Sequence, residues 1–282
     1  MTTPPLIAVT GSTGAVGGRV ARDLAARGIP QRLLVRDASR APSLEGVDVH
    51  VAGYSDADAA RTALQGVETL FMVSASETAD RVEHHRTFVE AAAAAGVRSI
   101  VYTSFLAAAP DAVFTLGRDH AATEEIIGAS GMRWTFLRDN FYMDMMELFA
   151  GDDGVIRGPA GHGRCSLVSR ADVAATAVSV LRDPGAHADT AYDLTGPEAL
   201  TMTEVAQKIS AVRGHPVRFV DESIDDAYAS RAAFGAPRWQ VDAWVSTYTA
   251  IASGDLAAVS DDVERVTGRK AQVFEEFLGA VS

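Results

Sequence analysis

The sequence is poor in residues that mark several common classes of protein. A single cysteine, Cys165, excludes an internal disulfide and a metal site built from several cysteines. Without an identifiable partner base, this thiol is interpreted as buried or incidental rather than catalytic. Acidic residues outnumber Lys plus Arg by 37 to 25, which gives a net charge of −12 with no basic stripe. We therefore expect no nucleic-acid partner.

Long apolar runs are also missing. No segment approaches the roughly 18 to 20 apolar residues that a membrane-spanning helix needs, so we expect no membrane association. Residues 1–5, Met-Thr-Thr-Pro-Pro, lack the charged start and apolar core of a signal peptide, and a cytoplasmic location is the expectation. What is present is a chain of 282 residues, 48% of them hydrophobic, which is enough for one large domain or for one domain with a smaller lobe.

Three glycines stand where a predicted strand turns into a helix. The apolar run 6–10 precedes Gly11, Gly14 and Gly17, and a helix is expected from Ala15. Gly11 permits a tight turn, Gly14 lets the backbone approach a pyrophosphate, and Gly17 lets the helix pack closely on the strand. The helix N-terminus offers free N–H groups to phosphates. The G-x-x-G-x-x-G spacing differs from the commonest fingerprint and a structural turn is the alternative, but its place in the chain predicts dinucleotide binding.

Apolar segments alternate with Ala-rich helical segments through the first half of the chain, a pattern typical of a parallel sheet covered on both faces. The predicted fold class is α/β, a Rossmann-like doubly wound parallel sheet with a smaller α/β C-terminal lobe. We place the nucleotide-binding domain at 1–150, with a helix at 170–182 packing back on it, and a substrate-binding lobe at 151–282. Strands are predicted at 6–10, 32–36, 47–51, 69–73, 98–103 and 133–138, and helices at 15–27, 56–64, 81–95, 118–129 and 140–150. The lobe is predicted to have a glycine loop at 151–163, strands at 192–194 and 217–220, and helices at 203–212, 224–234 and 238–252.

The end of the second strand indicates which dinucleotide is bound. An acid at this place favours the free 2′-hydroxyl of NAD, whereas an arginine accommodates the 2′-phosphate of NADP. Here Arg36 precedes Asp37, and Arg40 follows. We predict NADP(H) in preference to NAD(H), with Asp37 as a turn residue or a group that orients Arg36; a solvated cation is the alternative for Arg36. Ser74 to Ser76 end the fourth strand and are predicted to pass beneath the cofactor, although a plain turn would look the same.

The usual catalytic pair of short-chain reductases is absent. Those enzymes place a lysine four residues after a tyrosine, so that the ammonium lowers the pKa of the phenol that protonates the carbonyl. The only lysines, Lys208 and Lys270, have no tyrosine at that spacing. His120 and Glu124 share a helix face, so His120 is the predicted proton donor or substrate contact, oriented by the carboxylate; a solvated helix pair is the alternative.

Further candidate residues follow the fifth and sixth strands. Ser104 could bind a substrate carbonyl or the nicotinamide, and Asn140 could bind a carboxamide or a substrate oxygen. Phe105, Phe141 and Tyr142 are predicted to wall a substrate pocket, with a place in the core as the competing interpretation. His84 and His85 are interpreted as a solvated helix face, since no third ligand stands at helical spacing. No metal site is expected.

These segments together resemble the NmrA-like branch of the atypical short-chain dehydrogenase/reductases, most closely the bacterial type-2 quinone oxidoreductases and the triphenylmethane reductases. The matching segments cover nearly the whole chain: Thr10 to Gly17, Val35-Arg36, Gly66-Val67, Ala94 to Val97, Tyr102 to Ser104, His120, Thr123-Glu124, Leu137-Arg138, Arg170 to Asp172, Ser253-Gly254 and Ser260 to Asp262. Two positions depart from the pattern, because Gly53 replaces an acid and Asp139 replaces an asparagine.

The resemblance implies a site and a function. NADP would be bound through Gly11, Ser12, Thr13, Gly14, Ala15 and Val16, with Arg36 on the 2′-phosphate and Ser74, Ala75 and Ser76 along the cofactor. The missing Tyr-Lys pair is compatible with reductase activity in this branch.

We expect an NADPH-dependent reductase that transfers hydride to a quinone or another electron-poor conjugated carbonyl, a reaction in which placement matters more than a dedicated acid. The alternatives are a non-enzymatic NADP(H)-binding redox sensor or regulator of the NmrA type, and a ketone or imine reductase of specialised metabolism. The expected partner is a small-molecule quinone or carbonyl substrate, and a homodimer is left open.

Overall fold

A seven-stranded sheet organises the first part of the chain. The computed structural model describes residues 6–280; the segment 1–5, in which no signal peptide is expected, lies outside the described residues. The sheet has the strand order β3-β2-β1-β4-β5-β6-β9. Its strands are β1 (Ile7–Thr10), β2 (Gln31–Val35), β3 (Val47–Val51), β4 (Thr69–Met72), β5 (Ser99–Phe105), β6 (Arg133–Asp139) and β9 (Thr190–Leu194).

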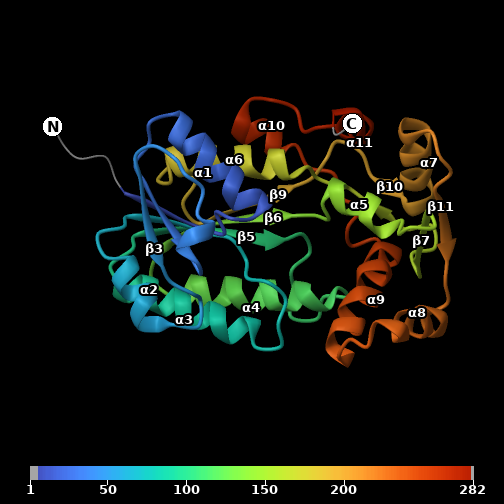
Figure 1. Cartoon of the computed structure of the whole chain (residues 1–282), viewed down its shortest axis with the longest axis horizontal. Helices are drawn as coiled ribbons and strands as arrows, with labels where there is room; N and C mark the ends of the chain where they lie inside the picture. Colours follow the sequence, from blue (N-terminus) through green and yellow to red (C-terminus); the bar gives the residue numbers. More distant parts are fainter. Residues whose placement is uncertain (1–5, 281–282) are drawn as a thin grey trace. The chain divides into compact units, whose positions relative to one another are not determined.

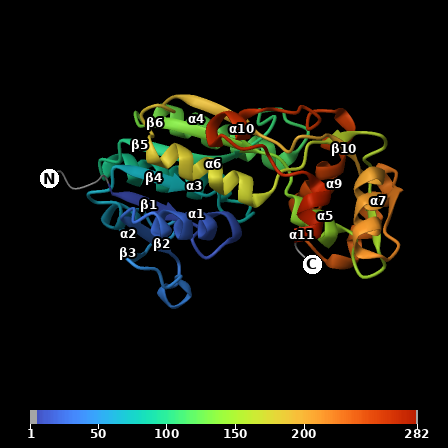
Figure 2. The same cartoon turned by 90° about the horizontal axis from the view of Figure 1, so that it is seen from above.

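Helices cover both faces of this sheet. In Figure 1, α1 (Ala15–Ala26) and α6 (Arg170–Arg182) lie on one face, with α2 (Ala57–Ala63), α3 (Arg81–Ala94) and α4 (Thr115–Ala129) on the other. Figure 2, the view from above, shows α1 and α6 side by side across the sheet. Every residue of β1, β4 and β5 is buried, as expected for strands that pack on helices from both sides. The predicted doubly wound α/β class is therefore confirmed.

The strand order reverses direction between β1 and β4. β1 pairs in parallel with β2 on one side and with β4 on the other, and β4 pairs in parallel with β5. Crossovers from β1 toward β3 run one way across the sheet, and those from β4 onward run the other way. The carboxyl ends of β1 and β4 therefore flank a topological switch point, which is where open α/β sheets bind their ligands.

The chain divides into two compact units that interleave along the sequence. Unit 1 consists of residues up to 104, 119–138 and 173–192, and unit 2 of 105–118, 139–172 and the residues from 193 on. The predicted single boundary at residue 150 differs from this division, because the segments after Ser104 and Arg138 already belong to unit 2. There Phe105, Phe114 and Phe141 join one core cluster. Residues 173–182 of α6 fall in unit 1.

Unit 2 contains more regular structure than the sequence predicts. The expected glycine loop contains β7 (Val155–Gly158), which pairs in parallel with β11 (Arg218–Asp221); β8 (Arg164–Cys165) pairs antiparallel with β10 (Leu200–Thr201). The strand expected near 192 is β9, which joins the main sheet instead. The helices are α5 (Met143–Phe149), α7 (Met202–Arg213), α8 (Ile224–Arg231), α9 (Arg238–Ser253), α10 (Asp262–Thr267) and α11 (Phe274–Ala280), the last two not predicted.

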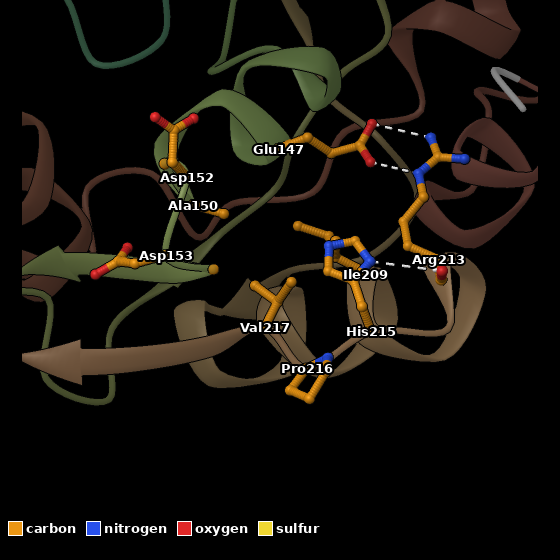
Figure 3. A pocket seen from close by; sticks show the side chains of 11 residues that line it. Glu147, Ala150, Asp152, Asp153, Ile209, Arg213, His215, Pro216 and Val217 are labelled. Carbon is orange, nitrogen blue, oxygen red and sulfur yellow. Dashed lines mark hydrogen bonds and ion pairs between the residues drawn. The ribbon is translucent and has the colours of Figure 1, made fainter.

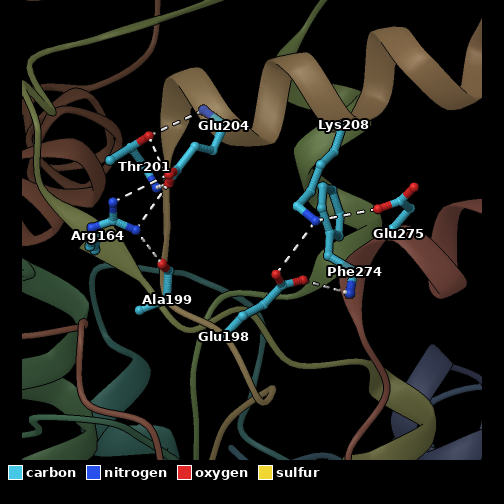
Figure 4. A network of polar contacts seen from close by, with 8 residues as sticks. All are labelled: Arg164, Glu198, Ala199, Thr201, Glu204, Lys208, Phe274 and Glu275. Carbon is cyan, nitrogen blue, oxygen red and sulfur yellow. Dashed lines mark hydrogen bonds and ion pairs between the residues drawn. The ribbon is translucent and has the colours of Figure 1, made fainter.

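A polar network fixes the start of α7 (Figure 4). The Thr201 hydroxyl accepts a hydrogen bond from the Glu204 backbone while the Glu204 carboxylate accepts from the Thr201 backbone, which is a capping box. Arg164 pairs with the same carboxylate at 3.1 Å. Further along α7, the Lys208 ammonium lies 3.5 Å from carboxylate oxygens of both Glu198 and Glu275. This lysine is therefore committed to ion pairs inside unit 2.

Between residues 6 and 280, no helix combines the length and apolar character needed to cross a bilayer.

Candidate functional site

The glycine turn after β1 has the geometry that its spacing predicts. Gly11 has φ +63°, a left-handed conformation that glycine adopts without strain, and the Gly14 N–H donates to the Gly11 carbonyl at 2.8 Å. A Cβ at Gly17 would stand 2.4 Å from the Gly11 oxygen and 2.6 Å from the Thr10 oxygen. Because both obstacles are backbone atoms, only glycine allows α1 to lie this close to the end of β1.

The first turn of α1 leaves phosphate-binding groups unused. Gly14 at the N-cap has no side chain to cap the helix, and the first turn contains no acidic residue. The Ser12 hydroxyl is buried, at 2% exposure, and has no hydrogen-bond partner among the described residues. A buried hydroxyl without a partner costs stability unless a ligand satisfies it. The turn therefore fits the pyrophosphate of a dinucleotide, which would accept from the helix N–H groups and from Ser12.

The end of β2 presents an exposed arginine and an acid that is already engaged. The Asp37 carboxylate accepts from the backbone N–H of Ser39 at 2.9 Å and from its hydroxyl at 2.7 Å, and these bonds lower the pKa of Asp37. Asp37 is thus a turn residue, as one of the two sequence interpretations holds. Arg36 is exposed, and no carboxylate within residues 6–280 pairs with it. The guanidinium is available for an anion.

The loop after β4, predicted to lie along the cofactor, is held by side chains of the interior. The Ser74 N–H donates to the Thr103 hydroxyl at 2.8 Å. The Ala75 N–H donates to His85 Nε2 at 2.9 Å. Both acceptors are buried, so the path of this loop is set by groups beneath it rather than by solvent.

Sequence reasoning missed His85. It placed His84 and His85 together on a solvated helix face, and this holds only for His84, which pairs with Asp80 at 3.1 Å. His85 has 0% exposure and lies on the buried stripe of α3. A signal was present in the sequence, because Phe88, Val89 and Ala92 follow His85 at helical spacings of three, four and seven residues.

His120 is buried, and its surroundings keep it neutral. Its Nε2 faces an Arg81 nitrogen at 3.4 Å, and its Nδ1 lies 3.1 Å from the Tyr102 hydroxyl. Since arginine can only donate, Nε2 is the acceptor and the ring proton on Nδ1 is directed to Tyr102. Burial, and then the positive charge of Arg81, lower the pKa of His120 well below 6.5. This geometry does not favour His120 as a proton donor at neutral pH, and its role as a substrate contact stays a prediction.

The carboxylate expected to orient His120 has other partners. Glu124 pairs with Arg138 through two hydrogen bonds, at 2.6 and 2.9 Å, and accepts from the Ser104 hydroxyl at 2.6 Å. Ser104 has therefore donated its only hydroxyl proton inside unit 1. Its oxygen can still accept a hydrogen bond, as from the N–H of a carboxamide, but it cannot donate to a substrate carbonyl in this arrangement.

Asn140 lies in unit 2 with its whole amide engaged. Its nitrogen donates to the Ser166 hydroxyl and to the Leu256 carbonyl, both at 3.0 Å. Its oxygen accepts from the Phe141 N–H at 2.8 Å and from the Cys165 thiol at 3.2 Å. Burial raises the pKa of that thiol, and Cys165 is buried as one of the interpretations of the sequence expects. The predicted role of Asn140 in positioning a substrate stays a prediction.

The aromatic residues predicted to wall a pocket are packed within unit 2. The ring centroid of Phe105 lies 4.8 Å from that of Phe114 and 5.1 Å from that of Phe141, and Phe105 and Phe141 are both less than a tenth exposed. Tyr142 is half-buried; its hydroxyl donates to Asp139, and the Arg170 guanidinium lies 4.3 Å from its ring centre. Asp139, where the family pattern has asparagine, is thus held by Tyr142. The pocket role of these three rings stays a prediction.

Unit 2 also contains a pocket of about 280 Å³ between the end of α5, the loop 150–154 and the residues that follow α7 (Figure 3). The Glu147 carboxylate and the Arg213 guanidinium form a two-bond ion pair in its wall, at 2.6 and 3.0 Å. All of the predicted catalytic and substrate residues are described, and none of them lines this pocket. The charged pair in this pocket is thus already satisfied within unit 2.

Comparison with known proteins places the chain among nucleotide-binding reductases. A family described as NAD(P)H-binding matches residues 11–184. An NAD(P)H azoreductase of Xenophilus azovorans is 36% identical over 281 residues, covering 98% of this chain and 97% of that protein. A (4-alkanoyl-5-oxo-2,5-dihydrofuran-3-yl)methyl phosphate reductase of Streptomyces griseus is also 36% identical, over 96% of each chain.

Solved structures give the same result. An NADPH-dependent quinone oxidoreductase of Escherichia coli, complexed with NADPH, is similar with a TM-score of 0.89 and 32% identity, over 98% of this chain and 99% of that one. The Citrobacter triphenylmethane reductase complexed with NADP(H) gives 0.86 and 29%, over 98% and 100%. NmrA, a negative transcriptional regulator solved with NADP, gives 0.75 over 99% and 96%; at 18% identity this likeness shows the fold alone.

A Ser12→Ala substitution should affect the affinity for NADPH and the free energy of unfolding differently. Removing a buried hydroxyl that has no partner should leave the free energy of unfolding of the cofactor-free protein unchanged or raise it slightly. Binding of NADPH should weaken by about five- to twentyfold, because the pyrophosphate loses one donor. Urea unfolding and fluorescence titration with NADPH measure the two effects. A loss of stability without a loss of affinity would contradict the assignment of Ser12 to the phosphate site.

Stability should depend on pH through the buried histidines. Burial first, and then the charges of Arg81 and His84, lower the pKa of His85 from 6.5 to about 3. An unfolded chain takes up a proton near pH 6.5 whereas the folded ring does not, so the stabilisation is fully present above pH 6.5 and is lost as the pH falls toward 3. Below pH 6, His85 should contribute a slope of about 1.4 kcal/mol per pH unit. Urea unfolding at several pH values should show a shallower slope for His85→Gln; an equal slope would contradict the neutral state of His85.

Proposed function

The chain belongs to the NAD(P)H-binding family as an NAD(P)H-dependent oxidoreductase of its NmrA-like branch, and on this premise we propose that it uses NADPH to reduce quinones or other electron-poor conjugated carbonyls. The observation that carries the proposal is the phosphate cradle at the switch point. There the uncapped N-terminus of α1 and the unpartnered Ser12 hydroxyl converge at the end of β1. Residues 11–16 would hold the pyrophosphate.

Preference for NADPH over NADH rests on the end of β2. Arg36 is exposed and Asp37 is occupied by Ser39, so the group available to the adenosine ribose is a cation rather than a carboxylate. A guanidinium suits a 2′-phosphate, to which it can donate two hydrogen bonds. Two of the similar solved structures are described as complexes with NADPH or NADP(H), which supports the same choice.

We propose a quinone as the hydride acceptor because neither candidate side chain is arranged to donate a proton. When bound, NADPH supplies a hydride, which together with a proton from solvent converts a quinone to a hydroquinone. His120 is neutral at pH 7 with its ring proton directed to Tyr102, and the Ser104 proton is held by Glu124. Neither side chain is arranged to protonate an oxygen as charge develops on it. A quinone suits such a site, because the anion formed by hydride transfer is stabilised by conjugation.

The chemistry named for the relatives is of this kind. Azo compounds, quinones, triphenylmethane dyes and an acyl-dihydrofuranone all present a conjugated, electron-poor π system to the reductant. For this chain we propose the quinone or conjugated-carbonyl class, with Phe105, Phe141 and Tyr142 as candidate apolar contacts. The Ser104 oxygen is then a candidate acceptor for the carboxamide N–H of the nicotinamide, and His120 a neutral contact beside it.

The test of the proposed function is NADPH oxidation, followed at 340 nm, with a panel of benzoquinones, naphthoquinones, azo dyes and conjugated enones. We expect turnover of quinones with simple ketones inert. Tight NADPH binding without turnover of any acceptor would contradict an enzymatic role and favour the NmrA-type regulator. Reduction of ketones or imines at comparable rates would instead require a proton donor that the present geometry does not provide.

Replacing Arg36 should alter the choice of dinucleotide. For Arg36→Gln we expect the KM for NADPH to rise about tenfold or more, because a charge-assisted pair with the 2′-phosphate is lost, while the KM for NADH changes little. Arg61→Gln is the matched control, since it removes one positive charge from an exposed arginine of α2 that pairs with Asp58. Equal effects on both dinucleotides, or equal effects of the two substitutions, would contradict the role of Arg36.

A further inference from the structure

The loop between β4 and α3 has its backbone fixed at three successive residues. The Tyr54 hydroxyl donates to the Val73 carbonyl at 2.5 Å, the Ser74 N–H donates to Thr103, and the Ala75 N–H donates to His85. The first two contacts come from hydroxyl groups, which can rotate to donate or accept. The third depends on an imidazole nitrogen, which can accept only when it carries no proton. The hydrogen bond from the Ala75 N–H therefore exists only when Nε2 of His85 carries no proton.

A contact on the opposite side of the His85 ring decides which of its two nitrogens carries the proton. His85 Nδ1 lies 2.8 Å from the Thr123 hydroxyl of α4. That hydroxyl donates its own proton to the Asp119 carbonyl at 2.7 Å, so its oxygen must accept from Nδ1–H. Neutral His85 then has its lone pair on Nε2, opposite the Ala75 N–H. In the other tautomer, two N–H groups would face each other across 2.9 Å.

The plane of the His85 ring is fixed as well. The ring packs edge-on against Tyr54, with centroids 5.8 Å apart, and against Tyr102, at 5.9 Å. The ring itself is fully buried, so its two nitrogens are placed among protein groups. Burial and the charge of Arg81 disfavour the doubly protonated ring, which would also lose this contact.

We propose that His85 is a positioning residue for the cofactor loop: Thr123 fixes its Nδ1–H tautomer, and its Nε2 holds Ala75 so that residues 74–76 keep the backbone path that receives NADPH. The inference rests on the proposed function, which puts this loop along the cofactor. His85 acts through the Ala75 backbone and touches neither the substrate nor the reacting atoms.

Two pairs of variants test the proposal. His85→Gln places an amide oxygen at about the reach of Nε2 and can still accept from Ala75, whereas His85→Phe keeps the ring and removes the acceptor. Thr123→Ser keeps the hydroxyl that selects the tautomer, whereas Thr123→Val removes this hydroxyl without changing His85 or the loop itself. His84→Gln, one residue away on the solvated side of α3, is the matched control.

Two readouts separate positioning from general stability. Hydrogen exchange of the Ala75 amide in the cofactor-free protein should be fast in the Phe and Val variants and slow in wild type, His85→Gln, Thr123→Ser and His84→Gln. At a temperature where circular dichroism shows every variant folded, the Kd for NADPH should rise about five- to tenfold in the Phe and Val variants and stay within about twofold in the others. A purely structural role would lower the Tm and leave this Kd unchanged.

The possible failures are distinguishable. The inference is overturned if the Ala75 amide of His85→Phe exchanges as slowly as that of the wild type. It is also overturned if the wild type binds NADPH and the Phe and Val variants bind it with the same Kd. Either result leaves the proposed function standing. If His85→Phe fails to fold, the Thr123→Val and Thr123→Ser pair gives the same decision, since the loop and the ring are intact in both. Absence of NADPH binding by the wild-type protein overturns the proposed function itself.

Discussion

The close approach of α1 to the end of β1 is the constraint on which the site depends. With Gly17 at the point of contact, the helix N-terminus is brought against the carboxyl edge of the sheet, beside the switch point between β1 and β4. A Cβ there would meet two backbone carbonyls, and the helix would have to move outward. The free N–H groups of α1 and the Ser12 hydroxyl would move with it. One missing methyl group thus sets the position of the whole phosphate cradle.

A second layer of constraint lies under the loop that faces this cradle. His85 and His120 are neutral because burial and the Arg81 charge oppose protonation, and both use their ring nitrogens inside unit 1. His85 holds the backbone N–H of Ala75, whereas His120 contacts the side chains of Arg81 and Tyr102. Neither neutral ring is arranged to donate a proton to a substrate at neutral pH. This arrangement fits a reductase that places an acceptor against the nicotinamide and leaves protonation to solvent. It also explains how the chain can lack a Tyr-Lys pair.

Local patterns predicted the sheet and the geometry of the glycine turn well. Apolar strand segments, the Gly11 to Gly17 spacing and the Arg36-Asp37 order depend on neighbours in sequence, and the structure has each where the pattern puts it. Long-range pairings could not be predicted this way. Glu124 was assigned to His120 by helical spacing, but Arg138 from β6 and Ser104 from β5 bind it instead. The division into units also depends on contacts such as those among Phe105, Phe114 and Phe141, which come from three separate segments.

In the proposed reaction, hydride transfer needs no proton from a side chain of the protein. The most direct measurement is the single-turnover rate of NADPH oxidation by a saturating benzoquinone between pH 6 and pH 8. We expect a rate that stays flat across this range, because burial and the charge of Arg81 lower the pKa of both His85 and His120. A rate that rises as the pH falls, with an apparent pKa near 6.5, would contradict it, as would tight NADPH binding with no transfer at any pH.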